Sequence, residues 1–145
     1  VTGVQTCALP ISGKGHNDFS ALQPEYLKPG KGIRWQKPVI VLTNRSVFSA
    51  ANEFVKYMKC CPNVIVVGDR TGGGAGMPFS SELPNGWSVR FSACPMYDRD
   101  KQMTEFGIDP DYKVSLTSDD FARGKDSIIE FARKMIKTFP KPQSL

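Results

Sequence analysis

The sequence predicts an α/β fold in which a helix connects two parallel strands, and three observations predict it. Pro38–Thr43 and Asn63–Val67 are short continuous apolar runs, as expected for strands that are buried on both faces. The segment between them places its apolar side chains at helical spacing. The connections are short, and a strand–helix–strand unit of this kind forms a right-handed crossover between parallel strands.

Length and composition indicate one globular domain: 145 residues, of which 40% are hydrophobic and 23% charged. These values exclude collagen-like, coiled-coil and wholly disordered chains. No apolar run approaches the roughly 18–20 residues that cross a bilayer, and no signal peptide is visible. The net charge of +5 is scattered, without the basic patch and interleaved aromatics of a nucleic-acid-binding module. We therefore expect no nucleic-acid partner.

Val1–Ile11 differs from the rest of the chain, since it has no charge and no periodicity. It resembles the translated sequence of a short-read sequencing adapter, so we expect a non-native segment and exclude it, with Cys7, from the fold predictions. The alternative is a genuine frayed N-terminus. If the segment is non-native, residues 12–139 form the C-terminal part of a domain, 140–145 form a tail, and further groups lie upstream.

The remaining cysteines are Cys60, Cys61 and Cys94. An adjacent pair and a single residue give neither a disulfide framework nor the CxxC spacing of a zinc site. We expect small buried side chains, at a helix end and in a strand. The redox compartment stays open.

The first half of the chain contains a loop before the strand–helix–strand unit. Residues 12–36 are rich in Gly, Pro, Asn and Asp, which predicts a loop. The helix is expected over Phe48–Cys60 and ends before Pro62. Its apolar face comprises Phe48, Ala51, Phe54, Val55 and Met58.

A glycine-rich loop, GDRTGGGAG, follows the second strand. It has neither the GK[ST] of a P-loop nor the GxGxxG of a dinucleotide site. Its glycines suit close approach of another chain, such as a peptide, although an ordinary flexible connection is equally compatible. Further on, Asn85-Gly86 favours a type I′ hairpin turn, and the alternation over residues 87–93 predicts a half-buried strand.

The C-terminal part is predicted to contain a loop and a helix. Turn-forming residues predict a loop over 104–111. The last helix is expected to run to about Lys137, with Ser118 or Asp119 as its cap.

Ser49 is the candidate nucleophile, because it lies at the start of a helix directly after a strand. Unpaired N–H groups and the positive end of the helix dipole face such a position. The N–H of Ala50 is placed to donate to an oxyanion. The alternative is that Ser49 or Ser46 merely caps the helix. Asn52 stands where a reciprocal capping box has Glu or Gln, so that box is absent.

Two other polar residues carry weaker signals. His16 is the only histidine, and its Gly/Asn/Asp surroundings favour a surface loop over a general base. Glu105 lies in a loop of the kind that often carries function, but a glutamate by itself indicates nothing specific.

Taken together, VIVLTNRSVFSAANEF, VIVVGDRTGGGAG and TEFGIDPD resemble the catalytic core of the tail-specific (C-terminal processing) serine peptidases and their tricorn-core relatives. The resemblance runs from about Pro38 to Asp111, with the order and spacing of the motifs kept. It implies a Clp-protease/crotonase-like fold of repeated ββα units, hydrolysis of peptide bonds, and no metal or organic cofactor. It also implies a location in the cell envelope, the periplasm or outside the cell.

The resemblance assigns roles to single residues. Ser49 matches the nucleophilic serine, and the amide of Ala50 matches one oxyanion donor. Many members carry a base lysine two residues after the TxG of the glycine loop, where this chain has Gly74, so the serine–lysine dyad is absent. The tricorn-like branch uses a histidine, a second serine and a glutamate instead, and Glu105 lies where that branch has its glutamate.

The remaining groups of that branch lie upstream of the matched region, and His16 does not match its histidine. We therefore expect the fragment to be inactive by itself. A peptide or protein substrate is expected to lie along Gly72, Gly73 and Gly74 by β-augmentation. Two alternatives remain: a non-catalytic peptide-binding relative, and a crotonase-type enzyme acting on acyl thioesters. The oligomeric state is open.

Overall fold

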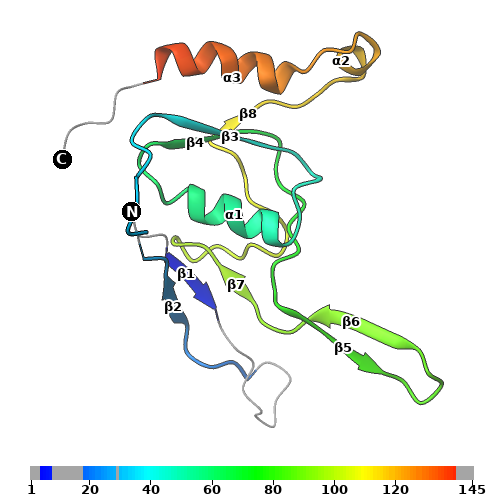
Figure 1. Cartoon of the computed structure of the whole chain (residues 1–145). Helices are drawn as coiled ribbons and strands as arrows, with labels where there is room; N and C mark the ends of the chain where they lie inside the picture. Colours follow the sequence, from blue (N-terminus) through cyan, green and yellow to red (C-terminus); the bar gives the residue numbers. More distant parts are fainter. Residues whose placement is uncertain (1–3, 8–17, 29, 140–145) are drawn as a thin grey trace.

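A computed structural model describes residues 4–7, 18–28 and 30–139, with the backbone alone for 4–7 (Figure 1). The strands are β1 (Val4–Cys7), β2 (Gln23–Tyr26), β3 (Val39–Thr43), β4 (Val64–Gly68), β5 (Pro78–Glu82), β6 (Ser88–Ser92), β7 (Met96–Tyr97) and β8 (Tyr112–Lys113). The helices are α1 (Ala50–Met58), α2 (Ser118–Ala122) and α3 (Ser127–Thr138). The α/β class predicted from the sequence is confirmed.

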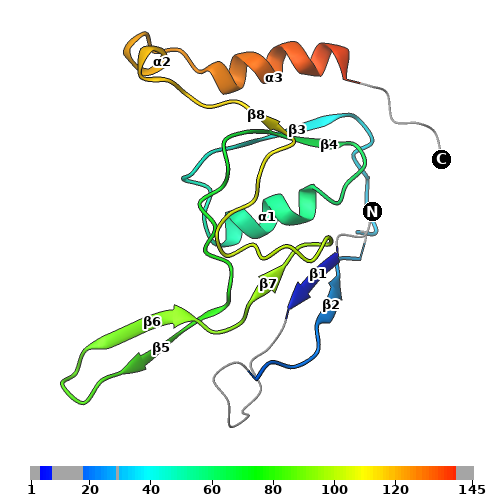
Figure 2. The same cartoon turned by 180° about the vertical axis from the view of Figure 1, so that it is seen from behind.

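The central sheet has the order β3-β4-β8, and both of its pairings are parallel. α1 connects β3 to β4, which confirms the predicted crossover, and α1 and α3 lie on opposite faces of the sheet (Figures 1 and 2). The core on the α1 face is formed by Val55, Val66 and Ile108. Leu42 is 41% exposed, so the expectation that β3 is buried on both faces is wrong on the α3 side.

A second sheet has the order β2-β1-β7, with antiparallel pairings, and α1 lies between the two sheets (Figure 1). β2 falls within residues 12–36, where only a loop was predicted. β1 falls within Val1–Ile11, for which no strand was predicted; the non-native origin of that segment stays a prediction. Backbone pairing with distant partners forms both strands, and local composition does not signal it.

The hairpin β5–β6 projects away from both sheets (Figures 1 and 2). The strand predicted for 87–93 is present as β6, but every residue of β5 is exposed and in β6 only Val89 is half-buried, so the predicted half-burial is wrong. The turn also differs from type I′: the Gly86 N–H donates to the Leu83 carbonyl at 2.9 Å, and Gly86 but not Asn85 has positive φ. Pro84 fixes its own φ near −65°, which selects a type I turn followed by a left-handed glycine.

The last helix is divided in two, contrary to the single helix predicted. α2 ends at Ala122 with Arg123 as its C-cap, and Gly124 follows in the left-handed region with φ 60°. Thr117 caps α2 through a capping box with Asp120, and Asp126 caps α3 by accepting from the Ile129 N–H at 2.9 Å. Ser118 and Asp119, the predicted caps, therefore lie inside α2.

The cysteines follow the prediction only in part. Cys60 and Cys61 are free and half-buried just beyond α1. Cys94 is 2% exposed, as expected for a small buried side chain, but it is disulfide-bonded. Within the described ranges, no helix has the length and apolar character needed to cross a membrane.

Candidate active site

Ser49 occupies the N-cap position of α1 in an unusual backbone conformation. Its φ is 58° and its ψ is −122°, a combination that non-glycine residues avoid. Residues held in such conformations cluster at functional sites. The side chain is exposed and makes no capping hydrogen bond. The alternative that Ser49 or Ser46 caps the helix is therefore wrong.

Backbone hydrogen bonds fix this strand-to-helix turn to the glycine loop. The Ser49 N–H donates to the Gly73 carbonyl at 2.8 Å, and the Gly72 N–H donates to the Val47 carbonyl at 2.8 Å. Phe48 and Gly73 form a parallel bridge. The loop therefore runs beside the turn like a short strand, which places Gly72, Gly73 and Ser49 together.

Ala50 is the first residue of α1. The first N–H groups of a helix have no intrahelical acceptor, so the Ala50 amide is available for hydrogen bonding beside the Ser49 side chain. Ala50 is also exposed. This arrangement provides one donor for a developing oxyanion.

Two glycines of the loop adopt conformations that other residues avoid. Gly73 has φ 80°, and a Cβ on it would overlap the backbone carbonyl of Glu105. Gly74 has φ 74°, and a Cβ there would overlap the ring of Phe48. The position at which the dyad branch carries its lysine is thus covered by an aromatic ring. Close packing, rather than flexibility, accounts for these glycines.

Glu105 also contacts the glycine loop, through its backbone. Its carbonyl accepts from the Gly74 N–H at 2.8 Å, while its half-buried carboxylate accepts from the Ser92 hydroxyl at 3.0 Å. The structure therefore brings Glu105 and Ser49 to the same loop, although within the described residues their side chains make no direct hydrogen bond. The sequence did not indicate Ser92, because β6 carries no recognisable motif there.

A mostly apolar cavity of about 350 Å³ lies beside Ser49. Ala50, Met77 and Met96 contribute to its lining. Tyr57 contributes too, and burial, with the nearby carboxylates of Glu25 and Glu53, raises the pKa of its phenol to about 12. The cavity therefore offers apolar surface next to Ser49, with Glu25 and Glu53 also in its lining.

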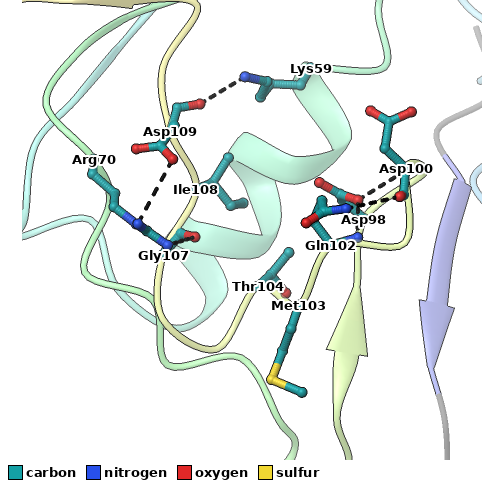
Figure 3. Close-up of a pocket in the computed structure, with 10 residues that line it drawn as sticks. All are labelled: Lys59, Arg70, Asp98, Asp100, Gln102, Met103, Thr104, Gly107, Ile108 and Asp109. Carbon is teal, nitrogen blue, oxygen red and sulfur yellow. Dashed lines mark hydrogen bonds and ion pairs between the residues drawn. The ribbon is translucent and has the colours of Figure 1, made fainter.

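The segment that carries Glu105 is also held from its other side (Figure 3). Arg70, from the glycine loop, donates to the Gly107 carbonyl at 3.3 Å and lies 3.8 Å from the Asp109 carboxylate. Lys59, just beyond α1, donates to the Asp109 carbonyl at 2.8 Å. These groups border a polar cleft of about 270 Å³. The described residues hold no cluster of His, Cys, Asp and Glu suited to a metal ion, and His16 lies outside them.

Comparison with known proteins identifies relatives of this chain. The family model described as peptidase family S41 matches residues 11–114. The crystal structure of a candidate peptidase from Parabacteroides merdae is 57% identical, with a TM-score of 0.82, over 92% of this chain and 42% of that chain. The tricorn protease is 25% identical, with a TM-score of 0.61, over 70% of this chain and 10% of its own.

An uncharacterized protein of Chlamydia muridarum is 26% identical over 117 residues, which is 77% of this chain and 20% of that protein. The chain thus spans about a fifth of that relative and less than half of the Parabacteroides merdae chain.

Proposed function

The chain belongs to peptidase family S41, and from this premise we propose that it supplies the nucleophile, Ser49, of a serine peptidase. The family confirms the resemblance seen in the motifs, and with it the α/β fold of the tail-specific and tricorn-core peptidases. Family membership supports peptidase activity of the longer protein, and that activity is part of the proposal. The serine mechanism, the peptide substrate and the residues named below are our proposal.

One observation carries the proposal. Ser49 is exposed at the N-terminus of α1, beside the Ala50 amide, and its side chain makes no capping hydrogen bond. In the proposed reaction, Ser49 Oγ attacks the carbonyl carbon of a peptide bond and gives its proton to a histidine. The Ala50 N–H donates to the resulting oxyanion. Collapse breaks the C–N bond, the amine leaves with the proton from the histidine, and water hydrolyses the acyl ester.

The histidine in this scheme comes from a part of a longer protein that precedes this chain. Gly74 stands where the dyad branch has its base lysine, so that base is missing here, and we expect the 145-residue chain to be inactive by itself. Residues 12–139 then form the C-terminal part of a catalytic domain, and Val1–Ile11 is a non-native segment. The longer protein is expected to act in the cell envelope or outside the cell, without a metal or organic cofactor.

Glu105 and the glycine loop have supporting roles. The Glu105 carboxylate accepts a hydrogen bond from the Ser92 hydroxyl, so it is suited to orient the polar network that activates Ser49. Gly72, Gly73 and Gly74 lie beside Ser49, and three of their backbone groups are already bonded to Val47, Ser49 and Glu105. In the proposal, a peptide substrate runs beside this segment and pairs with the backbone groups that these bonds leave over.

The test is Ser49→Ala in the full-length protein, with Ser46→Ala as the matched control from the same turn. We expect Ser49→Ala to abolish labelling by a fluorophosphonate probe and to lower peptide cleavage by about a thousandfold or more. Thermal unfolding should not change, because the Ser49 side chain makes no capping bond. Ser46→Ala should leave labelling and cleavage unchanged.

Other outcomes favour the alternatives. Peptide binding by a wild-type protein that neither cleaves peptides nor reacts with the probe would favour the non-catalytic relative. Thioester hydrolysis that persists in Ser49→Ala would favour the crotonase-type enzyme.

A further inference from the structure

One fully buried amide connects the three segments that carry the proposed functional residues. Asn52 lies one helical turn after Ser49 in α1 and is 0% exposed. Its Nδ2 donates to the Thr104 carbonyl at 3.2 Å, and its Oδ1 accepts from the Thr71 hydroxyl at 2.6 Å. Thr71 directly precedes Gly72, and Thr104 directly precedes Glu105.

The contacts continue beyond the amide. The Thr71 oxygen accepts from the Ile108 N–H at 2.6 Å, so this hydroxyl both donates and accepts. The Thr104 hydroxyl donates to the Met96 carbonyl at 3.3 Å. Thr71 and Thr104 are 2% and 1% exposed, so water does not substitute for these bonds. A buried polar network whose members are satisfied is rigid, and losing one member leaves the others unpaired.

We infer that Asn52 is a positioning residue, which fixes α1, the glycine loop and the 104–108 segment in the register that brings Ser49, Gly73 and Glu105 together. The functional meaning of that register rests on the proposed function above. The chemistry favours a carboxamide at this position. The Thr71 hydroxyl needs an acceptor and the Thr104 carbonyl needs a donor, and the side chain of Asn52 offers both at once.

The first experiment measures hydrogen exchange in the 145-residue chain and does not depend on catalysis. Two amides report on the register: that of Ser49, which donates to Gly73, and that of Gly74, which donates to Glu105. The Val39 amide, which donates to the Asn63 carbonyl at 2.9 Å in the central sheet, is the reference. The variants are Asn52→Leu and Thr71→Val, with Thr71→Ser as the conservative control.

We expect exchange at Ser49 and Gly74 to become at least about tenfold faster in Asn52→Leu and Thr71→Val, relative to Val39. Thr71→Ser keeps the hydroxyl and should retain the wild-type rates. Equal acceleration at all three amides, or none, would overturn the inference. Unfolding of both Asn52→Leu and Thr71→Val would overturn it too, because the network would then hold the whole fold rather than one register.

The second experiment uses the full-length protein. The rate of fluorophosphonate labelling at Ser49 should fall about tenfold or more in Thr71→Val and recover in Thr71→Ser. Unchanged labelling in Thr71→Val would overturn the functional part of the inference. If the wild-type protein is not labelled at all, the proposed function fails, while the exchange experiment still decides whether Asn52 fixes the register.

Discussion

Gly73 in the site and Gly86 in the β5–β6 hairpin have nearly the same φ, 80° and 83°, but very different surroundings. Backbone atoms of Glu105 and Gly107 crowd the position of a Cβ on Gly73, whereas nothing lies within 4 Å of one on Gly86. At Gly86 the glycine serves only the turn. At Gly73 it also lets two loops pack backbone against backbone.

The same contrast extends to the neighbouring side chains. Around Gly73, side chains such as Asn52 and Thr71 are almost fully buried and bond to distant parts of the chain. The hairpin is stabilised mainly by its own strand pairing and by the edge-to-face pair of Phe79 and Phe91, with centroids 4.2 Å apart. Substitutions at the site should therefore have long-range effects, and those in the hairpin local ones.

The largest expected effect separates the two glycines directly. Gly73→Ala should lower the free energy of unfolding by about 3 kcal/mol or more, because steric overlap adds to a backbone strain of about 1–3 kcal/mol. Gly86→Ala introduces the backbone strain without any steric overlap, so it should lower the free energy of unfolding by about 1 kcal/mol. Urea unfolding of both variants measures the difference, and equal losses would refute the role of packing at Gly73.

A second comparison applies one substitution in both regions. Val66 is 1% exposed in the core, so Val66→Ala should cost about 2–3 kcal/mol of unfolding free energy, from lost burial and the remaining cavity. Val89 is half-buried in the hairpin, so Val89→Ala should lower the free energy of unfolding by less than about 1 kcal/mol. Chemical denaturation of both variants measures the two losses of stability. A loss for Val89→Ala as large as that for Val66→Ala would contradict the contrast between the core and the hairpin.

The smallest effect concerns α2, an exposed segment with a dense set of local bonds. The Thr117 N–H, the Ser127 hydroxyl and the Thr117 hydroxyl lower the pKa of Asp120 from 3.8 to about 2. This stabilising contribution is present above pH 3.8 and is lost as the pH falls towards 2. The stability difference between wild type and Asp120→Asn should shrink over that range; a constant difference from pH 2 to 6 would contradict the assignment.

The sequence predicted the parts of the fold that depend on local pattern. The apolar runs of β3 and β4 and the helical spacing between them are such patterns, and all three elements are present. Exposure of the hairpin was not predictable, because alternation shows two distinct faces but not whether anything covers either one. The prediction of a single C-terminal helix was wrong. It followed an apolar stripe that continues past Gly124, but the backbone turns at that glycine.

The candidate site was predictable to a similar extent. The place of Ser49 between a strand and a helix is a local feature and was predictable, whereas its role as nucleophile came from the resemblance and stays a proposal. The sequence offered Asn52 only as the missing partner of a capping box, and its actual partners lie 19 and 52 positions away, at Thr71 and Thr104. Such pairings depend on how separate loops pack, which no local motif encodes.

The backbone of Gly74 restricts how the proposed site could acquire a lysine base during evolution. A Gly74→Lys substitution would have to displace the ring and also adopt a left-handed backbone. Phe48 is 59% exposed, so its ring has room to swing aside, and the left-handed backbone at Gly74 is the larger obstacle to a lysine there.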